Sequence, residues 1–349
     1  EITTRLVGSE MCIRDSDIPV FIDQKKDLSD NILVQYILAV LDIFSKNWSH
    51  EAVFNYIKTG FLQMEQEDIY ELENFCMKWG IKQTKWYKGE WNFKEDSKND
   101  EDRLEKMKKD KKVVAVVAGV PTNIGFTKEK REEAKDQFVD VGIAEEHAVA
   151  FVSGIAKNGG KPIFATHASF MQRTYDQLSQ DLCINKNPAT ILVNTASVYG
   201  MNDVTHLGLY DIPMMSNIPN LVYLAPTCKK EYFAMLDWSI EQNEFPVAIR
   251  VPCNGVISSE KEVERDYSNL NKFKVEEKGN KVAIIALGDF FEIGRSVLKG
   301  LKEELGISAT LINPRYITGL DEEYLEDLKQ DHDIVITLAV SYTHLTLPT

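Results

Sequence analysis

Apolar residues recur at helical spacing in the first third of the chain. Every third or fourth position is apolar in three segments, residues 31–48, 51–62 and 68–81. This period is typical of amphipathic helices, which bury one face and leave the other in water. Ser29 and Asp30 are candidate N-caps of the first segment, and Gly80 is a candidate C-cap of the last. The pattern predicts a small α-helical module.

A different pattern begins near residue 111. Short β-branched runs, typical of buried strands, occur at residues 112–121, 138–144, 162–167, 189–195, 220–226 and 246–252. Helical patterns lie among them at residues 173–184 and 229–242. The alternation predicts an α/β fold with a doubly wound, mainly parallel sheet. It resumes after a charged stretch, residues 258–271, and predicts a second α/β domain that is cut off after residue 338.

Charge and cysteine content exclude some classes of function. The 349 residues include 40 Lys and Arg against 54 Asp and Glu, a formal net charge of −14. An acidic surface repels phosphate groups, so we expect neither general nucleic-acid binding nor membrane binding. No apolar run approaches the length of about 18 residues that spans a bilayer. The five cysteines are too scattered for a metal-binding knuckle, and we expect a reduced, cytoplasmic setting.

Composition also changes sharply along the chain. Residues 17–110 hold three glycines, one proline and four of the five tryptophans, whereas residues 111–338 hold fifteen glycines and nine prolines. Between these parts, residues 93–112 are dense in charge of both signs, which is typical of a solvated helix or linker. We interpret the tryptophans as core residues; the alternative is a stacking surface for single-stranded nucleic acid.

The two ends differ in kind from the rest. One codon choice for residues 11–16 has a reverse complement that encodes residues 339–344, and such an inverted repeat is typical of sequencing adapters. We therefore expect residues 1–16 and 339–349 to be adapter-like and to form no domain. The remainder is expected to be a fragment truncated at both ends.

The first part contains a long pattern, IPVFIDQKKDLSDNILVQYILAVLDIFSKNWSHEAVFNYIKTGFL followed by IYELENFCMKWGI. Residues 17–108 are thereby similar to an internal segment of the AddB subunit of bacterial helicase–nucleases. The sequence has no GxxxxGK[ST] phosphate loop, no nuclease carboxylate cluster and no cysteine set for an iron–sulfur cluster. We therefore expect this segment neither to hydrolyse ATP nor to cut DNA.

The turn VGIAEEHA, residues 141–148, is the most informative place in the second part. It joins a predicted buried strand to a predicted helix, where a glutamate ordinarily caps the helix N-terminus. Glu145 and Glu146 are adjacent, so on a helix they diverge by about 100° and only one can point into a cleft. That carboxylate would lie among small apolar residues.

Five motifs follow one another in the second part: DVGIAEEHAVAF, ASFMQRTYDQLSQD, YGMNDVTHLGLYD, IPNLVYLAP and PVAIRVP. In this order they resemble the pyrimidine-binding domain of thiamine-diphosphate enzymes of the transketolase superfamily, most closely the 1-deoxy-D-xylulose-5-phosphate synthase family. The resemblance covers residues 111–338 and includes most of the family's C-terminal domain. It implies a transferase of isoprenoid precursor biosynthesis that uses thiamine diphosphate and Mg²⁺ and acts on keto acid or sugar substrates.

The resemblance also implies roles for single residues. Glu145 matches the family's signature glutamate, which bonds a ring nitrogen of the cofactor's aminopyrimidine and so activates the cofactor. Phe170 would stack on the aminopyrimidine, with Arg173 beside it. His206 would assist proton transfer or hold the substrate. No residue of this chain is expected to bind the metal.

Three substrate positions depart from the family pattern. Where this chain has His167, Thr195 and Cys253, the synthase family usually has a tyrosine and two arginines that grip the phosphate of glyceraldehyde 3-phosphate. His167 and Asn202 are expected to contact substrate, and Asn202 stands where an aspartate is usual. Because no bidentate guanidinium is available at either arginine position, we expect an altered acceptor, such as a non-phosphorylated one.

A further domain is implied but not found. In this superfamily a preceding domain with a GDG…N motif binds the diphosphate and Mg²⁺, and that motif does not occur in this sequence. We expect the fragment to be inactive alone and to need a diphosphate-binding domain or subunit, in a homo- or hetero-oligomer. The expected domains are an AddB-like helical segment, a pyrimidine-binding domain and a truncated C-terminal domain, at residues 17–108, 109–257 and 258–338.

Two other hypotheses stay open. The chain could be a fragment of an AddB-type subunit in DNA repair that carries the rest as a passenger. It could also be a homologue that keeps the fold without turnover, which the departures at His167, Thr195 and Cys253 motivate. The composition break favours an artificial join of two unrelated sequences, located within residues 104–112.

Overall fold

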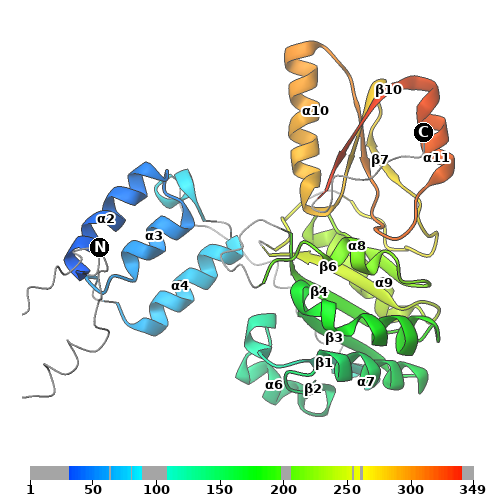
Figure 1. Ribbon diagram of the computed structural model, residues 1–349, viewed down its shortest axis with the longest axis horizontal. Helices are drawn as coiled ribbons and strands as arrows, with labels where there is room; N and C mark the ends of the chain where they lie inside the picture. The colour runs from blue at the N-terminus through cyan, green and yellow to red at the C-terminus, as the bar shows by residue number, and fades with distance from the viewer. Residues whose placement is uncertain are drawn as a thin grey trace, which may run out of the picture. The chain divides into compact units, whose positions relative to one another are not determined.

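The computed structural model describes residues 31–62, 64–79, 81–88, 108–197, 206–253, 255–259 and 262–339. The predicted caps Ser29, Asp30 and Gly80 lie outside these residues, as do Asn202 and most of the charged stretch at residues 93–112. The chain divides into two compact units, Glu1–Phe93 and Lys94–Thr349 (Figure 1). Each unit is described by itself.

The first unit is helical. Its elements are α2 (Ile32–Ser45), α3 (His50–Ile57), α4 (Gln66–Trp79) and the short 3-10 helix η2 (Gln83–Trp86). The N-cap of α2 is Asn31, and the predicted caps Ser29 and Asp30 precede it. Asn31 has an extended backbone, so its side chain accepts a hydrogen bond of 2.9 Å from the backbone N–H of Leu33.

The first unit has a small core of its own. Its buried residues come from all three α-helices and from the segment after α4, namely Ile43, Ala52, Val53, Phe54, Ile57, Ile69, Cys76 and Ile81. Trp48 and Trp86 are partly buried and pack against this core. For these two tryptophans the packing favours the interpretation as core residues over the stacking surface.

The second unit begins with a six-stranded sheet. Its strands are β1 (Val113–Val117), β2 (Phe138–Asp140), β3 (Lys161–His167), β4 (Thr190–Ala196), β5 (Val222–Leu224) and β6 (Val247–Pro252). Its helices are η3 (Pro121–Ile124), α6 (Lys128–Ala134), η4 (Lys135–Gln137), α7 (Glu145–Lys157), η5 (Ala168–Thr174), η6 (Gln177–Cys183), α8 (Asp211–Met215) and α9 (Lys229–Glu241). The strand order is β2-β1-β3-β4-β6-β5 and every pairing is parallel, which confirms the predicted fold class.

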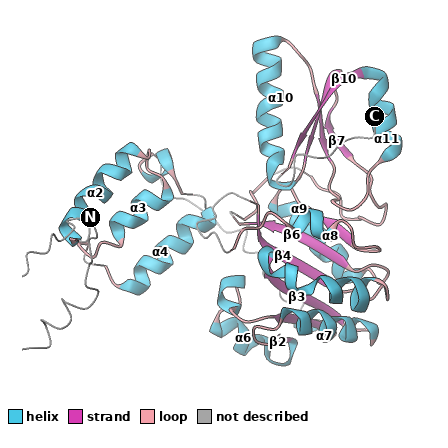
Figure 2. Ribbon diagram, in the orientation of Figure 1, coloured by secondary structure: helices cyan, strands magenta, loops and turns pink. Residues whose placement is uncertain are grey.

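Both faces of this sheet are covered by helices (Figure 2). Ile191 and Val193 of β4 lie in the core beneath α7, whereas Leu192 between them packs against the core beneath α9. Successive strand residues point to opposite faces, so a continuous apolar run is what a doubly covered strand requires. The unbroken β-branched runs in the sequence reflect this burial.

One predicted helix has a different geometry. Residues 173–184 are not one regular α-helix: the 3-10 helix η5 ends at Thr174, and η6 is a π-helix. Short 3-10 and π segments re-aim side chains that a regular helix would place elsewhere, and they are common at functional sites. η5 carries two of the predicted site residues, Phe170 and Arg173.

A second, smaller sheet follows. Its elements are β7 (Lys274–Glu277), β8 (Lys281–Ala286), η7 (Gly288–Phe290), α10 (Phe291–Leu305), β9 (Thr310–Asn313), α11 (Glu322–Asp331) and β10 (His332–Leu338). The strand order is β10-β8-β9-β7, and only β7 is antiparallel to its neighbour. β7 was not predicted because its residues are alternately half-buried and exposed at the edge of the sheet.

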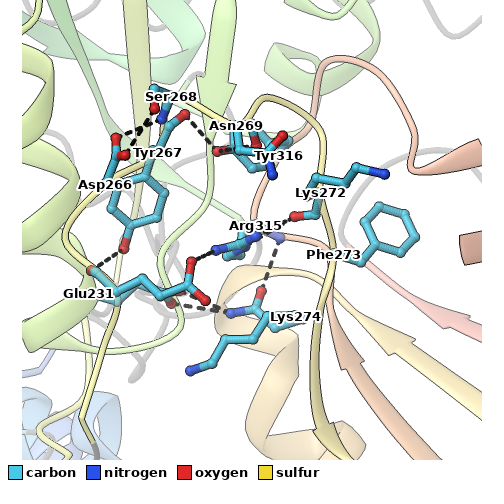
Figure 3. A network of polar contacts seen from close by, with 12 residues as sticks. Glu231, Asp266, Tyr267, Ser268, Asn269, Lys272, Phe273, Lys274, Arg315 and Tyr316 are labelled. Atoms are coloured by element: carbon cyan, nitrogen blue, oxygen red, sulfur yellow. Dashed lines mark hydrogen bonds and ion pairs between the residues drawn. The ribbon is translucent and has the colours of Figure 1, made fainter.

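The two sheets are joined by the segment that follows β9. The backbone N–H of Ala225 donates to the carbonyl of Arg315 (2.8 Å), and that of Ile317 donates to the carbonyl of Tyr223 (2.7 Å), so the segment lies along β5. The Arg315 Nε donates to the carbonyl of Lys272 at 3.2 Å (Figure 3). Tyr316 Oη donates to the carbonyl of Tyr267 at 2.8 Å. These contacts hold both sheets within one compact unit.

Among the helices that the structure describes, none combines the length and the apolar character needed to cross a membrane.

Candidate functional site

The candidate site lies where three neighbouring parallel strands end. β3, β4 and β6 are adjacent in the sheet. His167 is the last residue of β3, Thr195 lies near the end of β4, and Cys253 follows β6. Open parallel sheets bind ligands beyond the carboxyl ends of their strands. The three positions that depart from the family pattern therefore occupy the expected edge.

Glu145 begins helix α7 and is buried. Its side chain is 2% exposed, whereas that of Glu146 is 38% exposed. The two side chains diverge as helical geometry requires, so only Glu145 points inward. No side chain caps the N-terminus of α7 at Ala144. Glu145 thus places a carboxylate beside the free N–H groups of a helix start, where negative charge is favoured.

Arg173 of η5 contacts both glutamates. Its Nη1 lies 3.1 Å from Glu145 Oε2, and its Nε lies 3.3 Å from Glu146 Oε1. The first contact is an ion pair but is not aligned as a hydrogen bond, and Glu145 Oε2 has no hydrogen-bond partner. The site therefore contains a buried carboxylate oxygen that is balanced in charge but still able to accept a hydrogen bond.

His167 is joined to Thr195 across the sheet. Its Nδ1 and the Thr195 Oγ1 share a hydrogen bond of 2.6 Å. Burial lowers the pKa of His167, and the nearby His206 lowers it further. Both effects disfavour the charged imidazolium, so His167 is neutral at pH 7. Thr195 has a left-handed backbone with a φ of 56°, unusual for a β-branched residue.

Three rings gather beside this pair. The centroids of Phe170 and His206 lie 5.2 Å apart, those of His167 and Phe170 lie 5.5 Å apart, and those of His167 and His206 lie 5.9 Å apart. All three contacts are edge-to-face, the arrangement that the ring quadrupole favours. Since Phe170 and Arg173 share η5, one short helix connects this ring cluster to the Glu145 carboxylate.

Cys253 lies at the same edge, directly after β6. Its backbone N–H donates to the carbonyl of Ala196 at 2.8 Å, and burial raises the pKa of its thiol. The thiol is therefore a weakly polar neighbour and carries no charge at pH 7. The other predicted substrate residue, Asn202, lies outside the described residues.

Sequence reasoning missed a second polar cluster next to the site. Arg250 of β6 is 3% exposed and pairs with Asp211 of α8 and with Asp289 of η7. Tyr223 of β5 donates a hydrogen bond of 2.6 Å to Asp211. Nothing in the local sequence marked these residues as partners, because they come from four separate elements; a lone arginine in a buried strand was the available signal.

The described residues contain no group of three or more His, Cys, Asp or Glu side chains placed to hold a metal ion. They do contain groups that fit a nitrogen heterocycle: a half-buried ring at Phe170 and a buried acceptor at Glu145.

Comparison of the sequence with protein families identifies two domains. Residues 103–255 match the pyrimidine binding domain of transketolase, and residues 271–345 match the transketolase C-terminal domain. Among its relatives, the 1-deoxy-D-xylulose-5-phosphate synthase of Clostridium perfringens is 38% identical over 244 residues, which are 68% of this chain and 38% of that protein. The synthase of Alkaliphilus oremlandii is 40% identical over 232 residues, 66% of this chain and 36% of that protein. The chain thus spans little more than a third of the length of these relatives.

Solved structures show the same fold. A split-gene transketolase, described as an inactive β4 tetramer, is similar with a TM-score of 0.55 and 23% identity, over 67% of this chain and 75% of that one. A transketolase from Pichia stipitis is similar with a TM-score of 0.57 and 17% identity, over 67% of this chain and 37% of that one. The parallel sheet, the second sheet and the two family matches all indicate a transketolase-type fold. The second unit of this chain therefore contains a pyrimidine-binding domain and C-terminal domain sequence of the transketolase family.

Proposed function

We propose that the second unit is the aminopyrimidine-binding side of a thiamine-diphosphate-dependent transferase of the 1-deoxy-D-xylulose-5-phosphate synthase type. The observation that carries the proposal is the buried Glu145 Oε2, which has no hydrogen-bond partner. A buried acceptor without a donor costs free energy, and a ligand that supplies the donor recovers it. A protonated ring nitrogen of an aminopyrimidine is such a donor.

Three side chains divide the work of holding this cofactor. Glu145 would share a proton with the ring nitrogen through Oε2, and Arg173 would keep the carboxylate in place. Phe170 would offer its ring for stacking and exclude water from one side. When bound, thiamine diphosphate would supply the nucleophilic carbon and the electron sink for exchange of a carbon–carbon bond.

The two histidines would handle the substrates. The rings of His206 and His167 lie edge-to-face beside the carboxyl end of β3. Each imidazole can donate or accept a hydrogen bond there. His167 is neutral because burial lowers its pKa, so it would bind a carbonyl or hydroxyl group rather than an anion. With Thr195 bonded to His167, no cation is supplied at these two positions for a phosphate. We therefore propose a non-phosphorylated aldehyde or keto acid as the acceptor.

The site would be completed by another domain or chain. This chain covers 38% of the length of the Clostridium perfringens synthase, and the GDG…N motif that anchors diphosphate and Mg²⁺ in the superfamily is absent from its sequence. The split-gene transketolase described as an inactive β4 tetramer offers a parallel, since it too carries this fold. We propose that the chain is inactive alone and that a diphosphate-binding partner activates it within an oligomer.

A hybrid enzyme tests the role of Glu145. Residues 103–339 would replace the matching part of the Clostridium perfringens synthase, and thiamine-diphosphate-dependent turnover would be measured. Glu145→Gln is expected to lower kcat/KM by about 100-fold or more, because positioned proton transfer contributes about 10²–10⁴-fold. Glu146→Gln is the matched control and is expected to leave turnover nearly unchanged. Equal turnover in the parent hybrid and in Glu145→Gln would refute the proposal and favour a homologue without catalytic use of this residue.

The same hybrid tests the acceptor. We expect D-glyceraldehyde to be used with a lower KM than glyceraldehyde 3-phosphate. The double variant Thr195→Arg/Cys253→Arg is expected to reverse this order, because each arginine can form charge-assisted hydrogen bonds to a phosphate. Thr195→Ser keeps the hydroxyl beside His167 and serves as the control. Saturation of the parent hybrid by micromolar glyceraldehyde 3-phosphate would contradict the altered acceptor.

We also propose that the helical first unit and the transketolase-type second unit come from different genes. Each has its own core, and the composition changes between them. A long uninterrupted DNA read across codons 90–125 of the source material tests this. Separate continuations of the two parts on single molecules are expected; a native read that contains the join would show one natural two-part gene.

A further inference from the structure

Arg250 is the centre of a buried ion network beside the candidate site. Its Nε lies 2.7 Å from Asp211 Oδ2, and its Nη1 lies 3.4 Å from Asp289 Oδ1. Burial alone would lower the pKa of the guanidinium, but the carboxylates of Asp211 and Asp289 outweigh it and raise that pKa overall. Arg250 therefore remains charged and must keep its partners in place.

This network reaches the chain next to His206 through the carbonyl of Gly208. That carbonyl accepts a hydrogen bond of 3.0 Å from the Ser197 N–H and one of 3.3 Å from Arg250 Nη2. A side chain at position 208 would meet the Thr195 carbonyl at 2.4 Å, so only glycine allows so close an approach. His206 lies two residues before this fixed point.

The segment after Gly208 is held as well. Asp211 begins α8 three residues later, and its carboxylate binds Arg250 while accepting a hydrogen bond from Tyr223. The residues from Gly208 to Asp211 are thus attached at both ends to the strand ends of the six-stranded sheet. Because His206 lies two residues before Gly208, the fixed Gly208 carbonyl limits the positions open to His206.

Asp289 contacts both Ser197 and Arg250, the two residues that bind the Gly208 carbonyl. We call these four residues the clamp. Asp289 lies in the 3-10 helix η7, which follows β8. Its Oδ2 accepts a hydrogen bond of 2.5 Å from Ser197 Oγ, and its Oδ1 pairs with Arg250. Ser197 has a left-handed backbone with a φ of 76°, a conformation that costs free energy and needs outside support. Within the described network, Asp289 is the member that comes from the C-terminal domain.

We propose that Asp289 is a positioning residue through which the C-terminal domain holds His206 against His167 and Phe170. Asp289 fixes Ser197 and Arg250, these two fix the Gly208 carbonyl, and Gly208 sets the place of His206. The catalytic meaning of the clamp rests on the proposed function of His206. The clamp itself is a property of the described chain and can be measured without cofactor.

Amide hydrogen exchange and histidine NMR on the full 349-residue chain test the clamp. Asp289→Ala is expected to speed exchange of the Ser197 amide about tenfold or more, because the amide loses the support of its own side chain. The imidazole ¹⁵N signals of His206 are expected to shift in the same variant. Asp289→Asn keeps an acceptor for Ser197 Oγ and should give a smaller change in both quantities.

Glu292→Gln is the matched control. Glu292 lies three residues from Asp289, in the first turn of α10, and pairs with Arg295 on the surface. It is expected to leave the Ser197 exchange rate and the His206 signals as in the parent. If Asp289→Ala does not fold, Ser197→Ala removes the same hydroxyl contact and is expected to move the His206 signals.

Two results would overturn the proposal. In one, Asp289→Ala leaves both the Ser197 exchange rate and the His206 signals unchanged. In the other, it lowers the unfolding midpoint while the His206 signals stay in place, as for a merely structural residue. In the hybrid enzyme, Asp289→Ala is expected to lower kcat about tenfold with less effect on KM. A hybrid without turnover, together with shifted His206 signals, would refute the proposed function and leave the clamp intact.

Discussion

At the scale of single residues, burial decides which side chains of the site carry charge. The buried Glu145 is balanced by Arg173, and the buried Arg250 is balanced by Asp211 and Asp289. His167 has no such counter-charge among its described contacts, and burial lowers its pKa. The site therefore combines fixed ion pairs with a neutral imidazole.

The lowered pKa of His167 makes stability depend on pH. Because the folded-state pKa lies below the unfolded value of about 6.5, the unfolded chain takes up the proton first as the pH falls. The free energy of unfolding of the second unit is expected to decrease as the pH falls from about 6.5 toward the folded-state pKa. His167→Gln should flatten this part of the profile, measured by urea denaturation from pH 8 to pH 5.

His147→Gln is the control for that series, since His147 is exposed on α7. It is expected to keep the parent's pH profile. A profile for His167→Gln that parallels the parent's at every pH would contradict the expectation.

Removing one partner of the buried Arg250 ion pair is expected to be costly. Asp211→Asn should lower the free energy of unfolding by about 3–5 kcal/mol, because it leaves a buried charge without its main partner. Urea denaturation of the second unit measures this loss. Glu326→Gln removes an exposed pair with Lys329 and should cost less than about 1 kcal/mol. Equal losses in the two variants would show that burial does not set the value of the Arg250 pair.

At the scale of elements, irregular helices and strand ends build the site. The predicted helix at residues 173–184 is a 3-10 segment followed by a π-helix, and the 3-10 part brings Phe170 to the rings and Arg173 to the glutamates. Helical periodicity in the sequence could indicate a helix there but could not indicate its type. Whether the backbone hydrogen bonds of such a segment follow the 3-10, α or π pattern depends on the tertiary contacts of its side chains.

Helix α10 provides a matched pair of glycines. A Cβ at Gly294 would lie 2.8 Å from the Ala286 Cβ and 3.1 Å from the Leu311 Cδ1, whereas a Cβ at Gly300 would meet nothing within 4 Å. Gly294→Ala is expected to destabilise the second unit by about 1–3 kcal/mol through overpacking against the sheet. Gly300→Ala should stabilise it by about 0.5–1 kcal/mol, since alanine favours the helix. Denaturant midpoints measure both; the same sign for the two variants would contradict the packing argument.

At the scale of the whole molecule, two units with separate cores share one chain. Phe54 belongs to the core of the first unit, and Asp211 belongs to the buried ion network of the second. In differential scanning calorimetry of the full chain, Phe54→Ala is expected to lower one transition, since such a truncation costs about 3–5 kcal/mol. Asp211→Asn should lower the other and leave the first in place. A single transition that both variants move would show that the units unfold together.

Much of the architecture could be predicted because it depends on neighbours in the sequence. The period of apolar residues placed the helices and strands, and the unbroken β-branched runs indicated strands covered on both faces. The adjacency of Glu145 and Glu146 predicted that only one would point inward, and Glu145 is the buried one. The edge strand β7 and the cap at Asn31 were missed, because half-exposed strands and caps have weak local signals.

The α/β class, the order of strands and helices, and the motif at Glu145 could be predicted from the sequence, since periodicity and motif spacing are local properties. The partners of the site side chains could not: His167 bonds Thr195, Arg173 pairs with Glu145, and Asp289 reaches Arg250 from η7 of the C-terminal domain. These partners lie 28 to 39 residues apart along the chain. Such contacts follow from how sheets and helices close on one another, and that closure depends on burial across the whole unit rather than on any local pattern.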